Sequence, residues 1–171
     1  MPVPESRTDG GWFIVNVAGA PAKTNPRKGT WTQFEADEAR FEEFGINVTV
    51  LQPGQPNGAY HAENMQEDFL VLSGECVAIV EDRERPMRAW DFLHCPPGTR
   101  HIFVGAGDGP CAILMVGSRR PDEVLEYPAS EVAARYGATA TTPTASAEEA
   151  YADWPRTEPL ERMPWPPPAS A

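Results

Sequence analysis

Between residues 44 and 117 the chain alternates short apolar runs with turn-forming residues, and this pattern limits the folds open to it. Residues 46–50 alternate apolar and polar side chains, as in a strand with one buried and one solvated face. Six or more short strands at this spacing predict an all-β sandwich or barrel rather than a parallel sheet. Further short apolar runs lie at residues 69–72, 76–80, 92–95, 101–104 and 112–116.

The composition changes on both sides of this central region and divides the chain into three parts. We predict an N-terminal arm with one or two strands at residues 1–43, a β-barrel at residues 44–117, and a helical, proline-rich extension at residues 118–171. Trp154 and Trp165 in the extension are expected to pack against a neighbouring surface. The finer expectations are strands at 12–17 and 31–34, a loop at 21–29, a hairpin from 101–104 and 112–116, and short helices at 128–136 and after Ser146.

The charge of the chain excludes several classes of partner. The 14 Lys and Arg residues against 25 Asp and Glu residues give a net charge of −11, whereas nucleic acids and anionic membranes attract clustered positive charge. No apolar run approaches the roughly 20 residues of a membrane span, and the N-terminus lacks the apolar core of a signal peptide. We therefore expect a cytoplasmic protein that binds neither nucleic acid nor membranes.

The cysteines point to a reducing environment. Cys76, Cys95 and Cys111 are odd in number and lie 19 and 16 residues apart, which is neither a disulfide framework nor a zinc-ribbon spacing. We expect them to be reduced and to fill the core as small apolar side chains.

His61, Glu63, Glu67 and His101 are the candidate metal ligands. If residues 60–63 are extended, His61 and Glu63 point to the same face, because alternate side chains of a strand share a face. Glu67 and His101 each begin a later strand. Imidazole and carboxylate groups that converge inside a barrel favour a divalent transition metal such as Zn, Fe, Mn, Ni or Co over Ca or Mg.

The stretch around the first three of these residues resembles the first sequence motif of the cupin family. It reads PGQPNGAYHAENMQEDFLVLSG at residues 53–74. His61, Glu67 and Gly74 stand where that motif has a His, a Glu and its closing Gly. Glu63 replaces the second His of the motif.

A second stretch, WDFLHCPPGTRH at residues 90–101, resembles the second cupin motif. Asp91, the Pro96-x-Gly98 turn and His101 match that motif, whereas Trp90 replaces its Gly. The resemblance implies a jelly-roll barrel that holds one divalent metal ion and a small-molecule ligand, and it implies a homodimer.

The replacement at Glu63 leaves the ligand set open. If Glu63 binds, the family's three-His, one-Glu set becomes two His and two Glu. If it turns away, His61, Glu67 and His101 form a two-His, one-carboxylate triad with open positions, which suits O₂-activating iron. The third interpretation is a metal-free barrel in which these groups pair by hydrogen bonds.

The resemblance implies a metal-dependent enzyme, dioxygenase-like, that acts on a small organic substrate. An isomerase, epimerase or lyase is the neighbouring possibility, and a non-catalytic small-ligand or metal-binding protein is the alternative from another class. Glu63 and Tyr60 are the candidate catalytic residues, because each could transfer a proton beside a metal-bound ligand. Asn64 and Gln66 are weaker candidate ligands. Side chains expected mainly to fill the barrel are Tyr60, Phe69, Phe92, Cys95, Phe103 and Met115.

Overall fold

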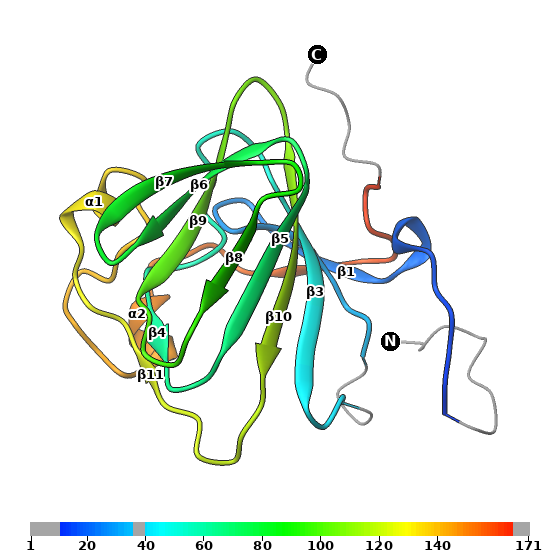
Figure 1. Ribbon diagram of the computed structural model, residues 1–171, viewed down its shortest axis with the longest axis horizontal. Helices are drawn as coiled ribbons and strands as arrows, with labels where there is room; N and C mark the ends of the chain where they lie inside the picture. Colours follow the sequence, from blue (N-terminus) through cyan, green and yellow to red (C-terminus); the bar gives the residue numbers. More distant parts are fainter. Residues whose placement is uncertain (1–10, 36–39, 166–171) are drawn as a thin grey trace.

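The computed structural model describes residues 11–35 and 40–165, and β-strands dominate both ranges (Figure 1). The helices in these ranges are short: a 3-10 helix (Val17–Gly19), α1 (Glu131–Ala134) and α2 (Ala147–Ala150). No helix among the described residues has the length and apolar character needed to cross a membrane. The strands are β1 (Ala22–Asn25), β2 (Gly29–Thr32), β3 (Phe44–Leu51), β4 (Ala62–Glu63), β5 (Glu67–Ser73), β6 (Glu75–Val80), β7 (Arg83–Arg88), β8 (Phe92–Cys95), β9 (His101–Ala106), β10 (Cys111–Ser118), β11 (Leu125–Glu126) and β12 (Glu158–Leu160).

Most of the strands form two antiparallel sheets that pack face to face. One sheet has the order β12-β1-β2-β3-β10-β5-β8, the other has the order β7-β6-β9, and β11 and β4 form a small separate pair. Neighbours in the large sheet are distant in sequence, since β10 lies between β3 and β5. This exchange of strands between two sheets is the jelly-roll arrangement, and it confirms the predicted all-β fold.

The core between the two sheets consists of side chains that share the inner face of each strand. Phe69 and Val71 of β5 meet Ala78 of β6 and Phe103 of β9, and each of the four is at most 2% exposed. The cysteines are buried in the same cluster as free thiols, which confirms that they fill the core: Cys76, Cys95 and Cys111.

Trp90 stands where the second cupin motif has Gly, and its backbone conformation explains why the motif has Gly at this position. Its φ angle is +74°, a left-handed conformation that glycine adopts without steric cost. The Trp90 N–H donates to Val71 O at 2.7 Å, and Asp91 Oδ2 accepts the Arg88 N–H at 2.9 Å. The turn of the motif is therefore kept, with a tryptophan side chain that is 75% exposed.

The N-terminal arm differs from the predicted one. Residues 12–17 contain no strand, and Ile14 is 80% exposed. Instead, β1 and β2 form a hairpin over residues 22–32. Strand β1 and the turn occupy the stretch at 21–29 where we predicted a loop, and β2 overlaps the strand predicted at 31–34. The side-chain oxygen of Asn25 accepts the N–H groups of Arg27 and Lys28 in the turn and so closes the hairpin. The periodicity of apolar residues gives no sign of such a turn, because a polar side chain closes it.

The predicted hairpin from residues 101–104 and 112–116 is also wrong. These segments are β9 and β10, which follow each other in sequence but lie in different sheets: β9 pairs with β6, and β10 pairs with β3 and β5. The glycine-rich turn between them carries the chain from one sheet to the other. Both segments are apolar, and an apolar pattern does not identify the neighbouring strand.

The C-terminal extension folds back onto the N-terminal arm. Helices α1 and α2 follow Ser130 and Ser146, whose hydroxyl oxygens each accept an N–H group from the first turn, as helix caps do. The predicted helices are confirmed, although they are shorter. Strand β12 pairs with β1, and Trp154 and Trp165 pack against apolar clusters as expected. Residues 166–168, the proline run, lie outside the described residues.

Candidate metal centre

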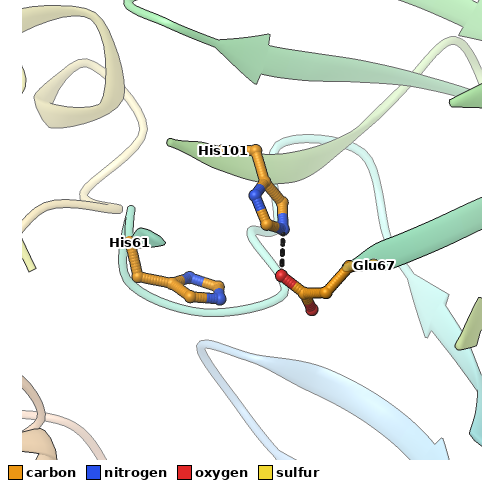
Figure 2. A group of neighbouring side chains, drawn as sticks. All are labelled: His61, Glu67 and His101. Atoms are coloured by element: carbon orange, nitrogen blue, oxygen red, sulfur yellow. Dashed lines mark ion pairs between the residues drawn. The ribbon is translucent and has the colours of Figure 1, made fainter. Parts of the chain in front are cut away.

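Two stretches that are distant in sequence bring His61, Glu67 and His101 together: residues 61–67, which end at the start of β5, and the start of β9 (Figure 2). His61 and His101 form an isolated antiparallel bridge, in which the His101 N–H donates to His61 O at 2.8 Å and the His61 N–H donates to His101 O at 3.3 Å. Glu67 begins β5 in the facing sheet. The bridge thus fixes both imidazole rings at the start of β9, opposite a carboxylate.

The ligand atoms of these three residues form a compact group. One atom of each side chain lies within 4.8 Å of the other two, and His101 Nε2 is 3.1 Å from Glu67 Oε2. The two imidazole rings lie 4.9 Å apart between centroids, and Phe69 packs against His101 at 5.1 Å. Two imidazole nitrogens and one carboxylate at this separation suit a divalent transition metal.

Backbone carbonyl groups orient both imidazole rings for this role. His61 Nδ1 lies 2.9 Å from Ala59 O, and His101 Nδ1 lies 3.0 Å from Thr99 O. Because a carbonyl oxygen only accepts, each Nδ1 carries a proton and each Nε2 points toward the centre of the group. Without a metal, His101 Nε2 also carries a proton and donates it to Glu67 Oε2, and a bound cation would take the place of that proton. Metal-binding histidines are held in this way by their second nitrogen. The residues therefore fit a metal ion.

Burial and mutual contact set the charges of the three groups. Burial, followed by the nearby His101, lowers the pKa of His61 to about 4, so this imidazole is neutral at neutral pH. Burial alone would lower the pKa of His101 and raise that of Glu67. The hydrogen bond between them prevails, so that the His101 pKa is raised and the Glu67 pKa is lowered. Glu67 is thus the anionic member of the group.

Glu63 lies beside the group rather than within it. Its Oε1 is 3.6 Å from His61 Nε2, and it is not one of the three residues whose ligand atoms converge. Strand β4 holds it against Leu125 of β11. Burial, followed by the negative charge of Glu67, raises the pKa of Glu63 to about 7. This carboxyl group can therefore hold or release a proton near neutral pH.

The structure does not bring Tyr60, the second candidate catalytic residue, to the group. Its side chain is fully buried in an apolar cluster with Ile79 and Ile102, behind the three-stranded sheet. Its hydroxyl oxygen accepts the Asp82 N–H at 2.9 Å. Tyr60 and His61 are adjacent in an extended segment, so their side chains point in opposite directions. Tyr60 therefore does not line the cavity in front of the group.

Asn64 and Gln66, the weaker candidate ligands, are turned away from the group. The Asn64 amide is hydrogen-bonded to the backbone of the loop before β11, and Gln66 donates to the carboxylate of Asp68. His94, the third histidine, forms an exposed pair with Asp68 at 2.7 Å. Phe92 does not fill the barrel as expected, because it is 63% exposed on the edge strand β8.

A cavity of about 450 Å³ opens in front of the three side chains. Phe69, which packs against His101, and Met115, which is paired with Phe69, line it, and so do Lys23, Trp31, Asn47 and Asn57. The sequence did not single out these four. Alternation along residues 46–50 placed Asn47 on the face opposite the apolar side chains, which was a usable signal. No pattern linked Lys23 and Trp31 to the barrel, because their segment was predicted as a loop and a separate strand.

Comparison with known proteins supports the fold. Residues 47–117 match the Cupin_2 family model, described as a cupin domain. A sugar phosphate isomerase of the cupin superfamily from Silicibacter pomeroyi is 24% identical, with a TM-score of 0.50 over 72% of this chain and 71% of that protein. A predicted oxalate decarboxylase from Thermotoga maritima is 20% identical, with a TM-score of 0.55 over 63% of this chain and 100% of that protein.

A candidate sugar phosphate isomerase from Acidithiobacillus ferrooxidans is 27% identical, with a TM-score of 0.48 over 50% of this chain. The chain spans 56% of the length of that protein. No curated protein sequence matches the chain. The family match and the two shared motifs, together with the jelly-roll topology, show that this chain contains a cupin domain of the Cupin_2 family at residues 47–117.

Proposed function

We propose that this protein is a divalent-metal-dependent enzyme with dioxygenase-like activity on a small organic substrate. The observation that carries the proposal is the convergence of His61, Glu67 and His101, with both Nε2 atoms oriented by backbone carbonyl groups, at one side of an open cavity. When bound there, a divalent ion would supply Lewis acidity or, as Fe²⁺, a site for O₂.

The residues around the group have separate roles in this proposal. His61 and His101 supply neutral nitrogen ligands, and Glu67 supplies the negative charge that offsets part of the charge of a cation. Phe69 and Met115 exclude water from the side of the cavity next to the group. Glu63 holds or accepts a proton at its carboxylate, 3.6 Å from His61 Nε2.

Glu63 also supports a second candidate function. A carboxyl group with a pKa of about 7, placed at the edge of a substrate cavity, is suited to moving a proton to or from a carbon atom. Such a step is the basis of isomerase, epimerase and lyase reactions. Oxygen consumption distinguishes this function from the dioxygenase, because proton transfer alone consumes no O₂.

Metal analysis of the purified protein, combined with an oxygen-uptake screen on phenolic and diketone compounds, tests the proposal. We expect about one divalent ion per chain and substrate-dependent O₂ consumption by the iron-loaded protein. The His101→Ala variant should lower metal affinity more than about 100-fold, since loss of even a supporting residue costs 10–100-fold. His94→Ala removes an exposed histidine and is the matched control.

Three outcomes would overturn parts of this proposal. Full metal occupancy in the His101→Ala variant would refute the proposed metal site. Occupied zinc without turnover of any substrate would favour a non-catalytic metal-binding protein. A Glu63→Gln variant that loses metal, rather than turnover alone, would make Glu63 a ligand instead of a proton carrier.

A further inference from the structure

We propose that the cavity binds a small monocarboxylic acid, whose carboxylate lies against Lys23, Asn47 and Asn57 while its apolar body reaches toward the metal-ligand group. The inference rests on the proposed function, because it names the substrate class of the same cavity. It is carried by the hydrogen-bond donors on the side of the cavity away from His61, Glu67 and His101.

A continuous row of side chains connects the two sides of the cavity. Phe69 of β5 packs against His101, and it is paired across the sheet with Met115 of β10, which is paired with Asn47 of β3. Residues paired in this way present their side chains on the same face of a sheet. The row spans two strand spacings, roughly 10 Å, which is about the length of a small substituted organic acid.

The amide of Asn57 is fixed so that it offers a donor to this row. Its oxygen accepts the Phe103 N–H at 2.8 Å, which assigns oxygen and nitrogen because a backbone N–H only donates. The nitrogen, Nδ2, lies 3.7 Å from Met115 Sδ, and sulfur is a weak acceptor. Asn57 therefore keeps donor capacity for a ligand above Met115.

Asn47 and Lys23 add donors on the same side. The Asn47 oxygen accepts the Thr49 hydroxyl at 2.8 Å, which leaves the amide nitrogen available. Lys23 is paired across the hairpin with Trp31, and both line the cavity. Among the described residues, no hydrogen bond or ion pair involves the Lys23 ammonium group. A half-buried ammonium group that has no anionic partner among the described residues can bind an anionic group of a ligand.

The remaining charges of the cavity favour a single negative charge on the ligand. Arg119 is already neutralised by a two-pronged ion pair with Glu35, and it also donates to Phe41 O. Arg40 is exposed at the rim and acts on the same Glu35. On the other side, Glu63 and Glu123 add negative charge near the metal-ligand group. One ammonium group, unpaired within residues 11–35 and 40–165, matches the single charge of a carboxylate better than the double charge of a phosphate dianion.

The walls of the cavity indicate the body of the ligand. Trp31, Phe69 and Met115 give the cavity flat or flexible apolar surfaces. Phe69 packs against His101, Met115 is paired with Phe69, and Trp31 is paired with Lys23. A planar or short aliphatic body packs there with its carboxylate in contact with the three donors. Benzoate has this shape and serves as the probe.

Calorimetric titration of the full-length protein, zinc-loaded and metal-free, tests the proposal. We expect benzoate to bind both forms, and benzamide and phenyl phosphate to bind more weakly. Lys23→Met should weaken benzoate binding about 10–100-fold, the size of a lost charged hydrogen bond, whereas Lys23→Arg should retain most of it. Arg85→Met, which removes the same charge from the exposed strand β7, is the matched control.

Asn57→Asp gives an independent readout, because it keeps the acceptor for the Phe103 N–H and replaces the donor with a negative charge. It should weaken benzoate binding at least as much as Lys23→Met. Equal affinity for benzamide, tighter binding of phenyl phosphate, or unchanged benzoate affinity in Lys23→Met would each overturn the inference. A protein that binds zinc but not benzoate refutes only this inference, whereas one that binds benzoate through Lys23 but no metal refutes only the proposed function.

Discussion

The two ends of the barrel interior are built from the same strands but have opposite chemistry. Strand β5 places Glu67, Phe69 and Val71 on its inner face, and β9 places His101 and Phe103 on its inner face. At one end these strands present ionisable groups to a cavity. Two residues further along, each strand presents an aromatic ring, and beyond it the interior is closed and apolar.

This difference shows how a rigid apolar layer supports a polar site. Phe69 and Phe103 pack against each other at 4.6 Å between ring centroids and lie against His101 at 5.1 and 6.3 Å. The aromatic layer is close-packed and dry, so it holds the histidine ring and removes water from one side of it. His61, whose ring lies against His101 and Tyr127, is also largely buried, and this burial lowers its pKa to about 4.

Replacement of the aromatic layer gives the largest expected effect. Phe103→Ala should lower the free energy of unfolding by about 3–5 kcal/mol, because it leaves a cavity in the core. Phe92→Ala removes the same ring from an exposed position and should change it by less than about 0.5 kcal/mol. Urea unfolding of both variants measures the difference. Equal losses would mean that the buried Phe103 ring contributes no more to stability than the exposed Phe92 ring, and that the aromatic layer does not support the site.

Removal of the Glu67–His101 pair at the open end should change the free energy of unfolding by less. The sign of this change shows whether the pair stabilises the fold. In metal-free protein, His101→Leu leaves Glu67 without its partner and should cost about 1–3 kcal/mol. The double variant Glu67→Met/His101→Leu removes both groups and should be neutral or up to about 2 kcal/mol more stable than the parent. Thermal unfolding in EDTA checks this. A double variant as unstable as the single one would show that the pair stabilises the fold.

The smallest expected effect concerns pH and Glu63. Burial raises the pKa of Glu63 from 4.5 to about 7, so the folded protein holds this proton more tightly than the unfolded chain. The resulting stabilisation is present below pH 4.5 and is lost as the pH rises to 7. We expect a difference of about 1 kcal/mol, reduced by partial exposure. Glu63→Gln should flatten the stability profile of metal-free protein in this range, and identical profiles would refute the assignment.

The sequence predicted the barrel and the metal-ligand group because both depend on local spacing. His61, Glu67 and Gly74 fall at fixed intervals along one stretch, and Pro96-x-Gly98 fixes where His101 begins the next strand. The jelly-roll topology then follows from the resemblance. Turns and the starts of strands set these positions, and both can be recognised from residue types and spacing in the sequence.

The cavity wall opposite the group could not be predicted in the same way. Lys23 and Trp31 reach the cavity only because β1 and β2 add to the edge of β3. The Asn25 side chain, which accepts the Arg27 N–H, closes the turn between these two strands. The prediction for Tyr60 rested on its nearness to His61 in sequence. Adjacent residues in an extended segment face opposite sides, and the Tyr60 hydroxyl oxygen accepts a hydrogen bond from the Asp82 N–H instead.

The attachment of the β1–β2 hairpin has a consequence for how the chain folds as it is synthesised. Asn25 donates to Pro155 O at 2.7 Å, a contact between residues 130 positions apart, and β12 completes the sheet beside β1. The hairpin is therefore synthesised well before β12, which is its last neighbour in the sheet. Contacts so distant in sequence form slowly. The strands of the barrel can pair before residues 158–160 are added, so the outer edge of the large sheet, where β12 joins β1, is expected to form after the barrel core.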